Sequence, residues 1–233
     1  MVSKMFDVQK ELSKLSEKYF REQHYICILY GSSVDKINKS DLDICFIVDY
    51  YDEKILNDLS IDIVNLHNKF NLMVDKEVPY SNKLIYNKSE VINLVKNSVF
   101  FKTSNKISIL KENDNIFETT EMKGRLLYNI LTTRNKILVN KCEEGTLEEY
   151  RYEAWKVIIN ALFKHNECLA IPLKELDSYL VEDGKNKIFY KDFLGYSPSN
   201  IDKDELNNFL LRMEKENAIM LSKSGEIIIK EFI

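Results

Sequence analysis

The sequence predicts an α+β protein with an N-terminal mixed β-sheet, flanking helices, and a mainly helical C-terminal region that ends in a β-hairpin. Two short apolar runs, at 25–30 and 42–49, lie on either side of a Gly-Ser turn and a polar loop, as expected for two buried strands. After residue 113 apolar residues recur mostly at three- and four-residue steps, which is typical of helices. We therefore expect two domains, 1–113 and 114–233.

The first domain is predicted to alternate helices with short strands. Asp52 is a candidate N-cap for its second helix, and His67 near the apolar face of that helix is interpreted as a residue at the edge of the core. A third strand is expected to stop at Pro79, because proline cannot donate to a strand ladder, and 80–87 is expected to be a polar loop. The expected elements are helices at 4–22, 53–70 and 89–97, and strands at 25–30, 42–49, 72–78, 99–102 and 107–111.

The second domain is predicted to be helical up to its closing hairpin. Thr146 and Glu149 form a capping box, and Trp155 beside the following apolar stripe is interpreted as a core residue. A helix followed by a hairpin is also typical of winged-helix DNA-binding domains. From residue 164 onward, however, ten Lys and Arg residues stand against thirteen Asp and Glu residues, which argues against DNA contact. The expected elements are helices at 119–134, 145–165, 172–182 and 203–216, and strands at 219–221 and 227–229.

Composition and charge narrow the functional class. The chain has 233 residues, 45% of them hydrophobic and 30% charged, and a net charge of −4, so no overall field attracts nucleic acid. The four cysteines are widely spaced and show no paired zinc-type spacing, which favours reduced thiols in a cytoplasmic protein. Residues 1–23 are amphipathic and charged rather than a signal peptide, and no apolar run is long enough to span a membrane.

Two acidic residues at the start of the second strand are the main candidates for chemistry. Side chains two residues apart in a strand share a face, so Asp41 and Asp43 should converge while Leu42 and Ile44 point into the core. Two adjacent carboxylates repel each other unless a cation lies between them. Magnesium suits such a site, because it prefers oxygen ligands and combines one or two carboxylates with substrate phosphates.

The turn before this strand has features of a phosphate-binding turn. Gly31 permits a tight turn and a close approach of the backbone, and Ser32 with the following amides could hold phosphate oxygens. Ser33 and Ser40 in the same connection are further candidates for nucleotide contacts. Lys83, in the loop at 80–87, could contact a phosphate or the acceptor.

The pattern of Gly31-Ser32, a spacer, and Asp41-x-Asp43 between apolar residues resembles the polymerase-β-like nucleotidyltransferase superfamily, over roughly residues 25–80. Small antibiotic nucleotidyltransferases and the minimal nucleotidyltransferases of toxin–antitoxin systems are members of comparable size. The resemblance implies a third metal-binding carboxylate on a later strand. Asp75 and Glu77 share a face of the predicted strand at 72–78, so both are candidates. Asp75 is favoured as the ligand, and Glu77 is the alternative ligand or could act as a base.

The resemblance implies that a nucleoside monophosphate is transferred from a nucleoside triphosphate to an acceptor hydroxyl. ATP is the nucleotide expected. Asp41 and Asp43 would bridge two Mg²⁺ ions roughly 3.5–4 Å apart, one of them completed by Asp75 or Glu77. A basic residue of the helical region would neutralise the triphosphate. The candidates are Arg125, Arg134, Arg151 and Lys156.

Three functions compete at this stage. A small-molecule acceptor, such as an antibiotic or a metabolite, is favoured by the added helical region, which could wall a pocket. A protein- or tRNA-modifying enzyme of the toxin–antitoxin type is the alternative, although its minimal forms are generally shorter than this chain. A non-catalytic binding module is the third, and the intact Asp41-x-Asp43 pair argues against it. No membrane or DNA partner is expected, and a homodimer is left open.

Overall fold

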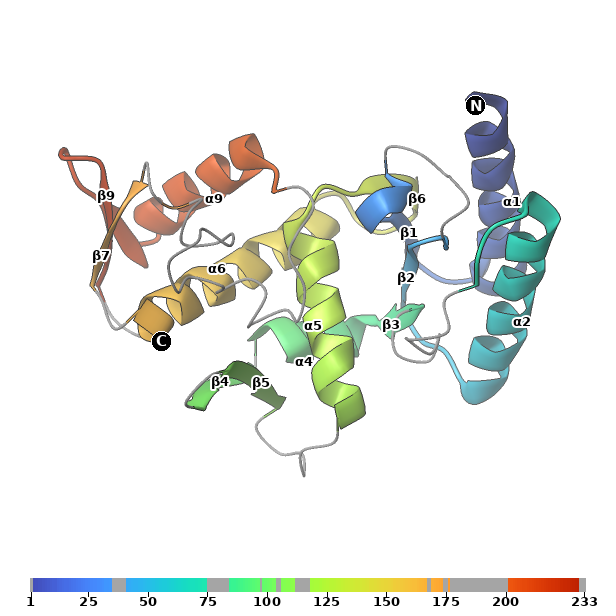
Figure 1. Cartoon of the computed structure of the whole chain (residues 1–233), viewed down its shortest axis with the longest axis horizontal. Coiled ribbons are helices and arrows are strands. Elements are labelled where there is room, and N and C mark those ends of the chain that lie inside the picture. Colours follow the sequence, from blue (N-terminus) through green and yellow to red (C-terminus); the bar gives the residue numbers. More distant parts are fainter. Residues whose placement is uncertain are drawn as a thin grey trace. The chain divides into compact units, whose positions relative to one another are not determined.

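The fold is α+β and divides into two compact units (Figure 1). The computed structural model describes residues 2–34, 41–74, 84–96, 98–103, 106–111, 118–166, 169–173, 176 and 201–230. The first unit comprises 1–93 and 133–146, and the second comprises 94–132 and 147–233. The segment 94–113, assigned from the sequence to the first domain, therefore clusters with the second unit, while 133–146 clusters with the first.

A mixed four-stranded sheet forms the centre of the first unit. Its strands, in spatial order, are β3 (Ile85–Asn87), β2 (Ile44–Val48), β1 (Tyr25–Leu29) and β6 (Lys136–Asn140). β1 is antiparallel to both β2 and β6, whereas β3 is parallel to β2. Every residue of β1 and β2 is buried, which explains why both read as continuous apolar runs.

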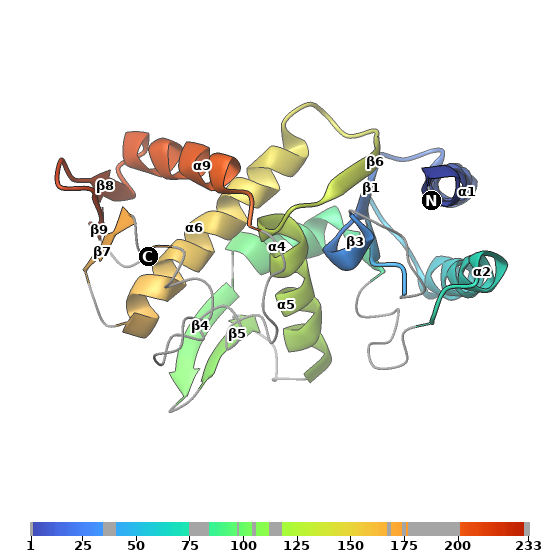
Figure 2. The ribbon, with the colours of Figure 1, turned by 45° about the horizontal axis from the view of Figure 1, so that its top comes forward.

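Two helices pack on one face of this sheet, α1 (Val2–Phe20) and α2 (Glu53–Phe70), and Figures 1 and 2 show them side by side. Both present an apolar stripe to alternate residues of the strands, so the four elements share one core. Asp52 caps α2 as predicted, because its side chain accepts a hydrogen bond from Ile55 N–H at 2.8 Å. The core residues from these elements are Val8, Leu12, Phe20, Tyr25, Cys27, Leu29, Ile44, Phe46, Val48, Leu59, Ile63 and Leu66.

Ion pairs join α1 to α2 on the outside of this core. Glu11 accepts hydrogen bonds from Lys14 (2.6 Å) and from Lys69 (2.8 Å), and Asp62 accepts one from Lys18 (2.6 Å). The contact with Lys14 and then that with Lys69 lower the pKa of Glu11 from 4.5 to about 2. The helix pair is thus held by charge at its surface as well as by apolar packing.

Among the described residues, the second unit contains three further helices. These are α5 (Glu118–Thr132), α6 (Thr146–Asn166) and α9 (Lys203–Lys215); α4 (Lys88–Lys96) crosses the division between the units. Its strands are the hairpin β4 (Ser98–Thr103) and β5 (Lys106–Lys111), and a three-stranded sheet of β7 (Ala170–Pro172), β9 (Glu226–Ile229) and β8 (Ile219–Leu221). Figure 2 shows α9 beside this sheet. Trp155 on α6 is fully buried, which confirms its interpretation as a core residue.

Several predicted elements need correction. Residues 85–87 form β3 rather than part of a polar loop, and β6 and β7 were not predicted at all. Pro172 ends β7 instead of opening a helix over 172–182, of which 174–175 and 177–182 lie outside the described residues. Leu72–Val74 carry no strand, and the rest of the strand predicted at 72–78 lies outside the described residues.

Candidate functional site

The Gly-Ser turn follows β1 directly and is a single turn of 3-10 helix at Gly31–Ser33. Gly31 has a φ of +57°, in the left-handed region that favours glycine. Within the turn, Ser33 N–H donates to Tyr30 O (3.3 Å) and Val34 N–H donates to Gly31 O (3.4 Å). The tight turn predicted at Gly31 is therefore present, and the amides of Ser33 and Val34 donate hydrogen bonds within it.

The antiparallel pairing of β1 and β2 brings this turn beside Asp43. Leu29 is the register partner of Ile44, and one further bond, from Tyr30 N–H to Asp43 O (3.1 Å), extends the ladder by a residue. Asp43 therefore lies opposite the first residues of the turn, although the two are more than ten positions apart in sequence. The predicted juxtaposition is therefore observed for the turn and Asp43, at the ends of the two central strands.

The carboxylate of Asp43 lies directly against the Cα of Gly31. A Cβ placed on Gly31 would lie 2.7 Å from Asp43 Oδ2 and 3.1 Å from its Cγ, closer than real Cβ atoms approach an oxygen. Only glycine leaves room for the carboxylate in this position. Gly31 thus has two roles, since it supplies both the backbone conformation and the space for an acidic side chain.

Exposure alternates along the acidic segment as the sequence predicts. Asp41 and Asp43 are both partly exposed, whereas Leu42 and Ile44 are buried, at 1% and 2%. The segment 41–43 nevertheless precedes β2, which begins only at Ile44. The acids therefore lie just outside the regular ladder, and their backbone needs other partners.

Side chains supply those partners. Ser33, 1% exposed, accepts a hydrogen bond at Oγ from Asp43 N–H (2.9 Å), and His67 on α2 accepts one at Nε2 from Leu42 N–H (2.9 Å). The second nitrogen of His67, Nδ1, lies 2.7 Å from Ile63 O. Because Leu42 N–H can only donate and Ile63 O can only accept, the imidazole is neutral with its proton on Nδ1.

His67 is the residue of this site that sequence reasoning missed. It is fully buried among apolar neighbours of the α2 face, including Ile63 and Leu66. A buried imidazole must be hydrogen-bonded, and the Leu42 amide just before β2 is one of its partners here. A histidine on the inward face of an otherwise apolar helix is the signal that could have pointed to such a bond.

The structure describes only part of the predicted site. Gly31 and Asp43 are brought together, and Ser33 is buried beside Asp43 with its hydroxyl on the Asp43 backbone, while Asp41 is partly exposed two residues before Asp43. Four predicted residues, Ser40, Asp75, Glu77 and Lys83, and the side chain of Ser32 lie outside the described residues. The third carboxylate and the lysine contact thus stay predictions.

The donor set suits a hard divalent cation. Two partly exposed carboxylates beside a turn can provide one or two oxygen ligands for Mg²⁺, which completes its shell with water and substrate phosphates. Over the described ranges, no three His, Cys, Asp or Glu side chains lie together so that they could hold a metal ion. Asp41 and Asp43 therefore fit a magnesium site that depends on further oxygen ligands.

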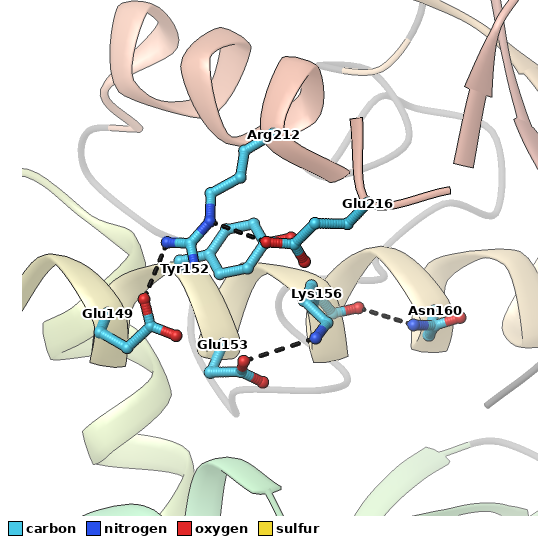
Figure 3. Close-up of polar contacts among 7 residues, drawn as sticks. All are labelled: Glu149, Tyr152, Glu153, Lys156, Asn160, Arg212 and Glu216. Carbon is cyan, nitrogen blue, oxygen red and sulfur yellow. Dashed lines mark hydrogen bonds and ion pairs between the residues drawn. The ribbon is translucent and has the colours of Figure 1, made fainter. Parts of the chain in front are cut away.

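A second polar cluster joins α6 to α9 within the second unit (Figure 3). The guanidinium of Arg212 lies over the ring of Tyr152, with Cζ 3.6 Å from the ring centroid, and bonds Glu149 (2.8 Å) and Glu216 (3.0 Å). Tyr152 Oη donates to Glu216, and burial followed by this contact raises the pKa of Tyr152. The charges drawn in Figure 3 are paired with one another, as expected of a packing contact.

Two of the cations proposed for the triphosphate are also paired inside this unit. Arg151, 8% exposed, forms an ion pair with Glu205 of α9. Lys156 lies 3.4 Å from Glu153 and over the ring of Tyr152. Arg151 thus links α6 to α9, whereas these two contacts of Lys156 lie within α6.

In comparisons with protein-family models, curated proteins and solved structures, nothing matches this chain. Among the described helices, none combines the length and apolar character needed to cross a membrane.

Proposed function

We propose that this protein is a metal-dependent nucleotidyltransferase that moves a nucleoside monophosphate from a nucleoside triphosphate to the hydroxyl of a small-molecule acceptor and releases pyrophosphate. The observation that carries the proposal is the carboxylate of Asp43 against the glycine of a tight turn, 2.7 Å from where a Cβ of Gly31 would lie. Asp41, two residues earlier in the chain, is also partly exposed. This is the arrangement expected from the resemblance to the polymerase-β-like nucleotidyltransferases.

Asp41 and Asp43 are assigned to hold Mg²⁺, with Asp75 or Glu77 as a third ligand. Bound magnesium supplies positive charge that stabilises the phosphates and the leaving group. The phosphate contacts of the turn are assigned to the amides of Gly31 and Ser32, because those of Ser33 and Val34 donate within the turn. The site then works mainly by positioning charged groups.

The proposed reaction is a single displacement at the α-phosphorus. The acceptor oxygen forms a bond to this phosphorus, the bond to the pyrophosphate oxygen breaks, and the hydroxyl proton leaves to solvent. ATP is the nucleotide we expect.

Incubation with each labelled nucleoside triphosphate, Mg²⁺ and a panel of acceptors tests the proposal directly. A mass increase of one nucleoside monophosphate on a small hydroxyl compound, together with pyrophosphate release, is the expected result. Parallel reactions with total tRNA and with the protein itself cover the toxin–antitoxin alternative, because label on either would move the acceptor to that class. Absence of pyrophosphate release with every nucleotide and acceptor class would contradict the proposal.

A matched pair of variants separates chemistry from folding. Asp43→Asn removes a ligand charge, and we expect it to abolish transfer while the unfolding midpoint stays close to that of the wild type. Asp52→Asn is the same substitution at the N-cap of α2, where asparagine caps as well as aspartate, so transfer should persist. Full activity in Asp43→Asn would refute the assignment.

A further inference from the structure

The backbone on either side of Leu42 is bonded by side chains from two different elements. Leu42 N–H donates to His67 Nε2 of α2, and Asp43 N–H donates to Ser33 Oγ of the turn, both at 2.9 Å. These two consecutive amides lie between the candidate metal ligands Asp41 and Asp43. The conformation of the acidic segment is therefore set from the helix and from the turn at once.

His67 is hydrogen-bonded at both ring nitrogens. Its side chain is fully buried, its Nδ1–H is directed to Ile63 O one helical turn earlier, and its Nε2 is directed to Leu42 N–H. The bond to Ile63 holds the ring in one orientation and one tautomer, which presents an acceptor to the acidic segment. An apolar residue would fill the same core position but would leave the Leu42 amide without this acceptor.

We propose that His67 is a positioning residue, which holds the Asp41–Asp43 segment in the conformation that places both carboxylates for a divalent cation before the cation arrives. This inference rests on the proposed function, because it takes the two acids as metal ligands. Residues that orient metal ligands change metal affinity by about 10- to 100-fold when they are replaced. The inference adds a residue of α2, far from the turn in sequence, to the determinants of metal binding.

The test compares two substitutions of His67 in the full-length protein, with Mn²⁺ alone as the probe. In His67→Gln, the side-chain oxygen can accept from Leu42 N–H at nearly the distance of Nε2, whereas His67→Leu fills the space without an acceptor. We expect His67→Leu to weaken Mn²⁺ binding, measured by the electron paramagnetic resonance signal of free Mn²⁺, by about 10- to 100-fold. His67→Gln should keep binding within about threefold of the wild type, a smaller change than the loss of about 10- to 100-fold expected of His67→Leu.

A second destabilised variant of α2 tests whether a general loss of packing, rather than loss of the bond to Leu42, weakens Mn²⁺ binding. Leu66→Ala truncates the neighbouring buried side chain of α2, which destabilises the same helix while leaving the bond to Leu42 in place. The folded fraction of this variant should bind Mn²⁺ as the wild type does. If Leu66→Ala weakens binding as much as His67→Leu, or if His67→Leu binds normally, the positioning role is overturned. Should His67→Leu not fold, loss of binding in His67→Gln at unchanged stability would overturn it as well.

The outcomes separate this inference from the proposed function. Normal Mn²⁺ affinity in His67→Leu, with affinity lost in Asp43→Asn, overturns the positioning role and leaves the nucleotidyltransferase proposal standing. Reduced affinity in His67→Leu without transfer from any nucleotide supports the positioning role and overturns the proposed reaction. Failure of the wild-type protein to bind Mn²⁺ overturns both.

Discussion

Replacement of Gly31 with alanine perturbs the candidate site at a single carbon atom. Gly31 has a φ of +57°, and an alanine forced into the left-handed region costs about 1–2 kcal/mol. The new Cβ would lie 2.7 Å from Asp43 Oδ2, whereas ordinary contact begins at 3.4 Å. The oxygen must therefore move by about 0.7 Å, the difference between these two distances.

This displacement predicts a functional loss larger than the loss of stability suggests. The carboxylate is the end of a flexible side chain, so its movement adds little to the free energy of unfolding. Ligand groups, however, must be held within about 0.5 Å of their working position, and an error of about 1 Å can cost about 100-fold in rate. We expect Gly31→Ala to lower Mn²⁺ affinity and transfer rate by about 10- to 100-fold, equivalent to about 1.4–2.7 kcal/mol.

Gly145→Ala is the matched control for the conformational strain that a positive φ imposes on alanine. Gly145 has a φ of +81°, and a Cβ there would meet nothing within 4 Å. Urea unfolding should show a similar loss of stability in both variants, while Mn²⁺ titration and pyrophosphate release should decline only in Gly31→Ala. Wild-type binding and transfer in Gly31→Ala would refute the reasoning that places Asp43 against this turn, and equal losses in the two variants would assign the effect to strain alone.

Three further predictions follow from burial and charge. During alkylation of the native protein, Cys142 should be modified well before Cys27, because burial raises the pKa of Cys27 to about 12 while Cys142 is only partly buried. Equal rates of modification, measured by peptide mass mapping, would contradict this. The thermal midpoint should fall as the pH drops from about 4.5 towards 2, because the lowered pKa of Glu11 gives a stabilisation that is complete above the ordinary pKa and is lost on protonation. The midpoint of Glu11→Gln should fall less over the same pH range. An identical fall in both proteins would argue against the ion pairs of Glu11 with its lysines. Tyr152→Phe should lower the free energy of urea unfolding by about 1 kcal/mol, because the hydrogen bond to Glu216 is lost; an unchanged midpoint would contradict this.

Local pattern was enough to predict the centre of the candidate site. The alternation of exposed Asp41 and Asp43 with buried Leu42 and Ile44 follows from the two-residue period of extended chain. The glycine of the turn was recognisable because few other residues adopt its conformation. These features depend on neighbours in sequence, so they could be predicted before any contact was known.

Features that depend on distant partners could not be predicted in this way. β6 is largely exposed and carries Lys136 and Asn140 at its ends, so only its pairing with β1 identifies it as a strand. β3 has three residues and is defined by its parallel partner β2. The role of His67 is of the same kind, because the Leu42 amide that it accepts from lies 25 residues earlier. Strand pairing and buried polar contacts are properties of the folded chain rather than of a sequence window.

The late position of β6 has a consequence for biosynthesis. β1 lies within the first 30 residues to be synthesised, but its second hydrogen-bonding edge is covered only when residues 136–140 have been made. Until then a fully buried, apolar strand presents unpaired amides and carbonyls, which are a template for pairing between nascent chains. Truncation ahead of residue 136 should therefore yield an insoluble product, whereas chains extending beyond 146 contain every strand of the first sheet.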